Sequence, residues 1–355
     1  MKKIEFADQL RGIAFISVLL VHWFGTFSLD RQLASTTINS DVASYGIEMF
    51  YQKIVPDFIP GFGFGPFGVG IFFVISGFVI PFSLLNKTKL QFIKSRMLRI
   101  MPTYVVCTLL SITLISLLGN SAEKSYLSPK EIISNLTLFQ TITLDRSVDM
   151  VNWTLAIEIK FYLICSLIKK QIERGSMTVL ILVPLVSLFV NLFSIKLPGM
   201  LPTELIFISF MLSGVAINLL YRNMIKKEHF VLYAFYLMSV TTVSFYNSQI
   251  ASQAFDESMS CTYALISFLV AYSFRSKIKP SKILRFISKI SYPLYLIHVT
   301  FGFTALNILL DNGFSKVASY LLAIAIVTVC SYLIHITIEA RTMSVSFRAK
   351  TERAA

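Results

Sequence analysis

The sequence of 355 residues is 55% hydrophobic and only 14% charged, and its mean hydropathy is +0.70. These values exclude a soluble globular protein and indicate an integral membrane protein. A net charge of +13 would suggest a nucleic-acid partner for a soluble protein, but here the charge follows membrane topology, and we expect no nucleic-acid partner.

The first apolar run, about residues 10–28, follows a basic start in the manner of a secretory signal peptide. Glu5 and Asp8 ahead of the run, a histidine inside it and no small-residue cleavage site argue against that interpretation. We therefore interpret the run as the first membrane helix. Arg11 and His22 lie on one stripe of it, about 16 Å apart along the axis. The pair indicates chemistry or ion passage, or else an interfacial anchor and a histidine bonded to a neighbouring helix.

Ten apolar windows are long enough to cross a hydrocarbon core of about 30 Å. They cover about 10–28, 67–85, 100–119, 151–168, 177–195, 203–221, 229–247, 257–274, 290–310 and 317–339. The N-terminus, the even-numbered loops and the C-terminus hold 24 Lys and Arg residues, against 7 in the odd-numbered loops. This asymmetry predicts an all-α polytopic protein with about ten transmembrane helices and both termini in the cytoplasm.

Two loops carry more basic residues than orientation requires. Lys94, Arg96 and Arg99 precede the third window, and six basic residues occupy 275–289. Such loops are explained by binding of anionic lipid headgroups, by binding of a phosphorylated cytoplasmic ligand, or by the orientation of the helices in the membrane alone. On the outer side, the glycines of 61–70 favour close backbone packing or a bend where the chain enters the bilayer.

Cysteines and histidines give no sign of a metal site. The cysteines lie in apolar runs without a CxxC spacing and are interpreted as buried hydrophobic residues. The histidines occur singly, without the spacing that places two ligands on one helix face, so we predict no metal. The residues are Cys107, Cys165, Cys261 and Cys330, and His22, His229, His298 and His335.

Helix depth suggests a partner for His22. This histidine lies about 18 Å from a cytoplasmic start at residue 10, and Glu158 lies about 10 Å below an outer start near residue 151, so their depths nearly coincide. A carboxylate bonded to an imidazole makes it an effective general base, while a buried ion pair joining two helices is the alternative. Thr154 and Tyr162 share the face of Glu158, and Lys160 points to the opposite side.

The ninth window opens with Ser291-Tyr-Pro-Leu-Tyr-Leu-Ile-His298. His298 lies about 12 Å deep, with Tyr295 nearby and Pro293 in the expected first turn. Two interpretations are open for His298: a catalytic role, or a structural hydrogen bond to an adjacent helix. Ser76 is expected to bond a backbone carbonyl rather than act as a nucleophile, because no histidine is near it in the sequence.

Five motifs in this order resemble the acyltransferase-3 family of membrane O-acyltransferases. They are Leu10-Arg11-Gly12 with ten residues intervening between Arg11 and His22, Gly68-Val-Gly-Ile-Phe-Phe-Val-Ile-Ser-Gly-Phe78, Arg96-Met-Leu-Arg99, Trp153-Thr-Leu-Ala-Ile-Glu158 and Ser291 to His298. The likeness covers essentially the whole chain.

The resemblance implies transfer of an acyl group, usually acetyl, from cytoplasmic acyl-coenzyme A to a hydroxyl of a cell-surface glycan such as O-antigen lipopolysaccharide or exopolysaccharide. It implies catalytic roles for His22, Glu158 and His298, and binding of the donor by Arg11, Arg96 and Arg99. Acyl-coenzyme A would be a substrate, with no permanently bound cofactor; the other partners would be the acceptor and membrane lipids.

The resemblance also implies a bacterial inner-membrane protein with one acyltransferase domain over 1–341 and a short basic tail over 342–355. Family members often end the last helix with Glu-x-Pro, whereas Glu339 is followed here by Ala340-Arg341. No role is therefore assigned to Glu339.

Two other classes compete with the enzyme. A transporter or flippase would use the buried His and Glu as a proton relay, and broken helices in two symmetric halves would favour it, but no internal repeat is seen. A passive scaffold for a surface-polysaccharide complex predicts that substitution of the buried charges leaves function intact.

Overall fold

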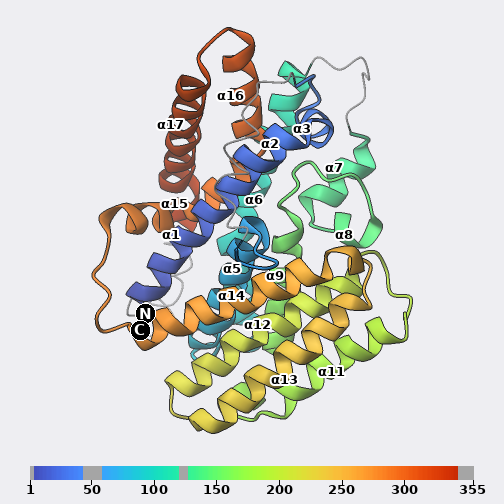
Figure 1. Cartoon of the computed structure of the whole chain (residues 1–355), viewed down its shortest axis with the longest axis vertical. Helices are drawn as coiled ribbons and strands as arrows, with labels where there is room; N and C mark the ends of the chain where they lie inside the picture. Colours follow the sequence, from blue (N-terminus) through green and yellow to red (C-terminus); the bar gives the residue numbers. More distant parts are fainter. Residues whose placement is uncertain (1–3, 43–57, 120–126, 343–355) are drawn as a thin grey trace.

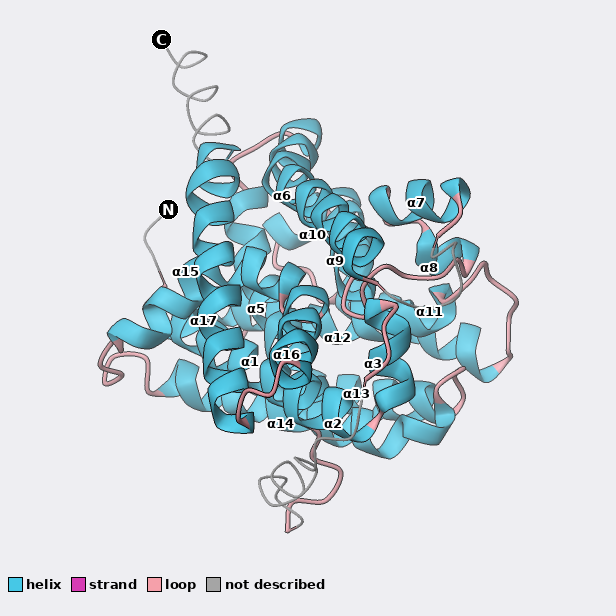
Figure 2. Ribbon diagram, turned by 90° about the horizontal axis from the view of Figure 1, so that it is seen from above, coloured by secondary structure: helices cyan, strands magenta, loops and turns pink. Residues whose placement is uncertain are grey.

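The computed structural model describes residues 4–42, 58–119 and 127–342, and these residues form helices without any strand (Figure 2). The predicted tail, apart from Thr342, lies outside the described residues. The helices are α1 (Glu5–Leu20), η1 (Val21–Thr26), α2 (Phe27–Leu29), α3 (Arg31–Ile38), α5 (Phe64–Leu84), α6 (Lys89–Leu118), α7 (Pro129–Leu136), α8 (Gln140–Thr143), α9 (Trp153–Leu167), α10 (Lys169–Glu173), α11 (Thr178–Leu192), α12 (Leu201–Tyr221), α13 (Lys227–Tyr246), η2 (Ala251–Gln253), α14 (Ala254–Ser273), α15 (Lys282–Ile297), α16 (Thr300–Asp311), α17 (Lys316–Ile334) and η3 (His335–Glu339).

Six helical segments of the described chain are long and apolar enough to span a membrane. They are Glu5–Leu29, Phe64–Leu84, Lys89–Leu118, Leu201–Tyr221, Lys227–Tyr246 and Lys316–Thr342. Together α15 and α16 pass the same test, but they are bent by 75° at a short break. Each predicted window falls on a helix, whereas the number of ten spans and the side of the termini stay predictions.

Several helix boundaries differ from the windows because capping residues set them. A capping box of Thr88 and Gln91 begins α6 at Lys89, well before the apolar window that starts at residue 100. The side chain of Ser281 accepts a hydrogen bond from Leu284 N and begins α15 at Lys282. The expectation that Pro293 lies in a first turn is therefore wrong, because this proline lies inside α15.

Glycines let α5 and α12 pack backbone to backbone at the centre of the bundle. A Cβ at Gly77 would lie 2.0 Å from the carbonyl oxygen of Met211, and one at Gly214 would lie 2.2 Å from that of Val74. Asn218 Nδ2 donates to the carbonyl of Phe78 over 2.8 Å across the same contact. Small residues commonly allow such approaches in membranes.

The glycine-rich stretch packs closely against α1, as one of its two interpretations predicts. A Cβ at Gly68 would lie 2.7 Å from the carbonyl oxygen of Ala14, and Ser17 Oγ donates to the carbonyl of Phe64 over 2.6 Å. At its C-terminal end α1 passes into η1, a π-helical segment, just before His22. Such π-bulges are frequent at functional sites.

The chain brings α15 beside α1 (Figure 1). The side chain of Gln9 accepts a hydrogen bond from Ser281 N over 3.1 Å, and Arg285 forms an ion pair with Glu5 over 3.0 Å. These contacts place the late histidine motif against the first helix. The start of α1 and the loop between α14 and α15 consequently lie on the same side of the molecule, on the left in Figure 1.

Candidate active site

Two histidines from opposite ends of the sequence form a pair. His22 Nδ1 lies 2.8 Å from His298 Nε2, and the ring centroids are 5.0 Å apart. The side chain of His298 is fully buried, with Phe15 edge-on to its ring, whereas His22 is half-buried. Of the two imidazoles, only His22 therefore keeps exposed surface.

The backbone fixes which nitrogen of each ring carries a proton. His298 Nδ1 lies 2.8 Å from the carbonyl oxygen of Tyr295, and a carbonyl can only accept, so this Nδ1 carries hydrogen. In the neutral pair, His298 Nε2 is then a lone-pair acceptor, and His22 Nδ1 donates to it. His22 Nε2 is consequently left with a free lone pair, as a general base requires.

The break between α15 and α16 positions His298. This residue ends α15, and its carbonyl oxygen accepts a hydrogen bond from the indole Nε1 of Trp23 over 2.8 Å. Trp23 is fully buried and packs on the first turn of α16, where a Cβ at Gly302 would lie 2.6 Å from its ring. The residue after His22 thus supports the partner of His22.

Glu158 does not bond to His22, so the predicted pairing of these two residues is wrong. Its Oε1 accepts hydrogen bonds from Ser76 Oγ over 2.8 Å and from Tyr162 OH over 2.6 Å. The expectation that Ser76 bonds a backbone carbonyl is wrong for the same reason. The shared face of Glu158 and Tyr162 is confirmed.

Lys160 points away from Glu158, as predicted. Its Nζ forms a buried ion pair with Glu204 over 2.7 Å and donates to Thr141 Oγ1 over 3.2 Å. This pair joins α9 to α12 and belongs to the scaffold rather than to the site.

Three arginines converge near Glu158. Arg11 interacts electrostatically with Arg99 and Glu158. Arg96 also interacts electrostatically with Arg99 and Glu158, and its guanidinium lies 5.6 Å from the ring centroid of Phe92 and 5.7 Å from that of Tyr162. The sequence motifs of α1, α6 and α9 are therefore brought to one place.

These arginines have little internal compensation. Arg11 pairs with Asp8 over 3.4 Å, but Arg96 and Arg99 form no salt bridge within the part of the chain that the structure describes. Arg96 is 8% exposed, and its Nε has no hydrogen-bond partner. A buried cation without a salt bridge is costly and is expected where a ligand supplies negative charge.

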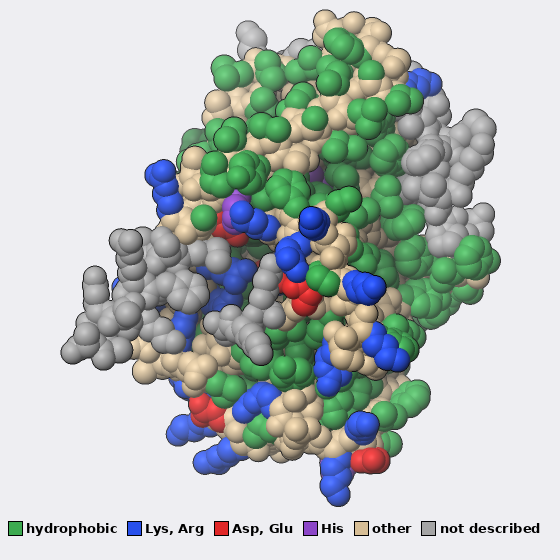
Figure 3. All heavy atoms as spheres, turned by 90° about the vertical axis from the view of Figure 1, so that its left-hand side faces the viewer, with side chains coloured by type: hydrophobic (Ala, Val, Ile, Leu, Met, Phe, Trp, Pro, Cys, Tyr) green, Lys and Arg blue, Asp and Glu red, His purple; other side chains and the backbone are tan. Residues whose placement is uncertain are grey.

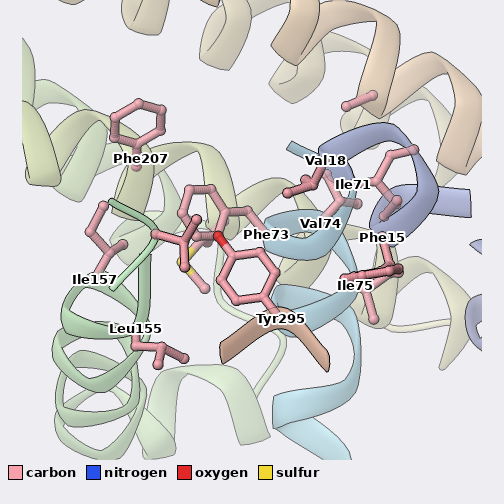
Figure 4. Close-up of a cluster of buried hydrophobic side chains, with 14 of the residues drawn as sticks. Phe15, Val18, Ile71, Phe73, Val74, Ile75, Leu155, Ile157, Phe207 and Tyr295 are labelled. Carbon is pink, nitrogen blue, oxygen red and sulfur yellow. The ribbon is translucent and has the colours of Figure 1, made fainter. Parts of the chain in front are cut away.

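Basic side chains gather on one face of the molecule. Figure 3 shows Lys and Arg side chains gathered on the face where α1 begins, around a hollow with basic side chains inside it. Deeper in the bundle the layer between α1, α5 and α9 is apolar, with Tyr295 reaching across it (Figure 4). The hydroxyl of Tyr295 lies 3.0 Å from Thr154 Oγ1.

The six predicted site residues thus form two groups. His22 and His298 make one, while Arg11, Arg96, Arg99 and Glu158 make the other. Sequence reasoning missed the pairing of the histidines and the part played by Trp23. The depths inferred for His22 and His298 would have allowed the pairing, whereas an indole in an apolar run carries no such signal.

Fold and site together define a multi-pass integral membrane protein of α-helices, with a histidine pair and a cluster of arginines inside the bundle. The chain belongs to the acyltransferase-3 family, because the sequence profile of the family, described as an acyltransferase domain, matches residues 4–336. The family resemblance inferred from the motifs is confirmed. No curated protein and no solved structure matches the chain.

Proposed function

We propose that the protein transfers an acyl group, most simply acetyl, from cytoplasmic acyl-coenzyme A to a hydroxyl of a cell-surface glycan. The observation that carries this proposal is the orientation of the histidine pair, which leaves the lone pair of His22 Nε2 free. Family membership supports acyl transfer as the reaction. The donor, the acceptor and the acetyl group are parts of the proposal.

The arginine cluster suits the phosphates of coenzyme A. Planar guanidinium forks match phosphate oxygens better than ammonium groups do. The unpartnered Nε of buried Arg96 supports an anionic ligand, and Arg99 offers a second fork nearby. Arg11 lies on the same helix as His22, about 16 Å away along its axis, so the thin pantetheine arm would bridge the two groups.

The proposed chemistry conserves atoms and charge. His22 Nε2 takes the proton of the acceptor hydroxyl, the oxygen attacks the thioester carbonyl carbon, and the carbon–sulfur bond breaks. The protonated His22 then returns its proton to the coenzyme A thiolate. While His22 is charged, its Nδ1–H continues to donate to His298 Nε2, so His298 stabilises the imidazolium that forms.

Glu158 has a different role from the one expected at first. Its contacts with Ser76 and Tyr162 support a role in holding the wall of the donor site and balancing the arginines. The half-buried carboxylate then acts on donor binding rather than on the base. Substitution of Glu158 should consequently raise KM for the donor more than it lowers kcat.

The proposed location is the bacterial inner membrane, with the acceptor approaching from the outer face. The depth of His22 in the outer half of the first span supports this direction. O-antigen and exopolysaccharide sugars are the acceptor classes that we propose first.

A transporter is the competing function, and the bent pair α15 and α16 is the feature that favours it. Broken helices in transporters come in two symmetry-related copies. Within the described residues one bent pair of this kind is found. In the acyltransferase proposal, the break between α15 and α16 serves to position His298.

Radiolabelled acetyl-coenzyme A and purified protein test the proposal. We expect thioester hydrolysis or acyl exchange that fails in His22→Ala, and a donor KM about tenfold higher in Arg96→Lys with little change in kcat. Arg174→Gln is the matched control, because Arg174 is an exposed cation at the end of α10. Full turnover by His22→Ala would refute the assignment of the base. Absence of binding and turnover with every acyl-coenzyme A tried would favour the transporter.

A further inference from the structure

A buried carboxylate of the segment between α8 and α9 contacts the break next to His298. Asp149 is 3% exposed, and its Oδ2 accepts a hydrogen bond from Thr300 Oγ1 over 2.8 Å. Its Oδ1 accepts from the backbone N–H of Val151 over 3.2 Å, and the backbone N–H of Thr300 also bonds to the carboxylate. These contacts join a segment before α9 to the first residue of α16.

The break is thus held from both sides. The indole of Trp23 satisfies the carbonyl oxygen of His298, the last residue before the break. Asp149 satisfies donors at the start of α16, where the first N–H groups of a helix lack intrahelical partners. The carboxylate also lies at the positive end of the α16 dipole. His298 lies between these two attachment points.

Asp149 has no cation to compensate its charge. Among the described residues it forms no salt bridge, and its electrostatic neighbours are Tyr104, Cys107 and Tyr295. Burial therefore raises the pKa of Asp149 to about 7, with the hydrogen bonds from Thr300 and Val151 opposing the shift. The contacts that hold this carboxylate in place are those with the break and with its own loop.

We propose that Asp149 is a positioning residue that holds the break between α15 and α16, so that His298 Nε2 stays within hydrogen-bonding distance of His22 Nδ1. Its consequence for catalysis rests on the proposed acyl transfer, but its effect on the histidine pair does not. Without the Asp149 contact, α16 is free to rotate about the break and His298 loses its fixed orientation. His22 then behaves as an isolated imidazole.

The test measures the histidine pair directly. Diethyl pyrocarbonate modifies unprotonated imidazole nitrogen. Peptide mass spectrometry of the purified full-length protein gives the rate at which His22 is modified as a function of pH. Exposed His229 serves as the internal reference. His298→Ala shows the profile of His22 without its partner, and Asp149→Ala and Thr300→Val should reproduce that profile.

Asp149→Asn is the conservative variant, because an amide can accept from Val151 and donate to the hydroxyl of Thr300. We expect its profile to stay within about half a pH unit of the wild type. Asp145→Asn is the matched control, because Asp145 lies in the same loop but pairs with exposed Lys130 over 2.8 Å. Thermal melting of each variant checks folding, and Thr300→Val retains the test if Asp149→Ala does not fold.

An unchanged His22 profile in Thr300→Val would overturn the proposal. An equal effect of Asp145→Asn would do the same. Acetyl-coenzyme A turnover is measured in parallel. Failure of turnover in the wild type would reject the proposed acyl transfer, while the modification profiles would still decide the role of Asp149.

Discussion

At the residue scale, the chemistry of His22 depends on a backbone carbonyl that it does not touch. The carbonyl of Tyr295 determines which nitrogen of His298 is protonated, and His298 in turn determines which nitrogen of His22 is free. The sequence places His22 inside an apolar run on the Arg11 stripe, which is enough to nominate it. Its partner depends on which helix packs against α1, and depth alone indicated Glu158.

His298 therefore has a role that substitution can separate from packing. We expect His298→Ala to lower kcat by about 10²-fold, within the usual contribution of acid–base catalysis, while the donor KM changes little. His298→Gln should recover part of kcat, because the amide oxygen can accept from His22 Nδ1. Steady-state kinetics against pH are the measurement, with His229→Ala as control. Equal losses in the Ala and Gln variants would contradict this role.

Buried Asp149 predicts a pH dependence of stability. Its pKa is about 7 in the folded protein and 3.8 ordinarily, so the folded state binds this proton more tightly than the unfolded chain does. The resulting stabilisation is present at low pH and is lost as pH rises towards 7. Between pH 5 and pH 8, the melting temperature of the wild type should fall by a few degrees relative to Asp149→Asn.

Asp145→Asn provides the contrast for that measurement. Hydrogen bonds from Lys130 and Thr143 lower the pKa of Asp145 to about 2, so its charge is constant between pH 5 and pH 8. Its melting curve should follow the wild type at every pH in this range. Parallel curves for wild type and Asp149→Asn would show that Asp149 does not titrate there.

At the element scale, hydropathy predicted where helices occur but not where one of them breaks. The window 290–310 was expected as one span, whereas the structure has a 75° bend between Ile297 and Thr300. The residues at the break, His298 and Val299, include neither glycine nor proline, so no local signal marks it. The break is stabilised by Trp23 and Asp149, which are distant in sequence, and a single window cannot contain them.

The contact between α5 and α12 gives a prediction at the same scale. Gly214→Ala places a Cβ 2.2 Å from the carbonyl oxygen of Val74, so the two helices must separate. We expect a loss of about 1–3 kcal/mol, typical of an overpacked core, seen as a lower melting temperature in detergent. Ser213→Ala is the neighbouring control, because its buried hydroxyl has no partner and its loss should be nearly neutral. Equal melting of both variants would contradict the importance of this contact.

At the scale of the whole molecule, hydropathy recovered the all-helical architecture, and the ordered motifs recovered the family. The convergence of Arg11, Arg96 and Arg99 was also predictable, because all three were expected near one membrane surface. What the sequence could not supply was the arrangement of helices around α1. Arg96 could be nominated from its motif, but its contact with Tyr162 depends on how α6 packs on α9.

The predicted number of ten spans has its clearest test at α14. This helix has 20 residues, but serines and the acidic Asp256 and Glu257 in its first turn lower its hydropathy, and it is not among the six segments that are long and apolar enough to span a membrane. In the bundle it runs antiparallel to α13 and packs on α5, both of which meet the test (Figure 1). A helix packed between two spans is expected to cross with them, because a bilayer leaves no aqueous space beside them.

Cysteine labelling measures this crossing. In a background with all four native cysteines replaced by alanine, Asn247→Cys and Lys279→Cys place single exposed thiols just before and just after α14. A membrane-impermeant maleimide applied to sealed inside-out and right-side-out vesicles should label Lys279→Cys from the cytoplasmic side and Asn247→Cys from the outer side. Labelling of both thiols from one side would mean that α14 returns within the membrane. That result would leave two spans after α13 and nine in total, and would move one of the two termini out of the cytoplasm.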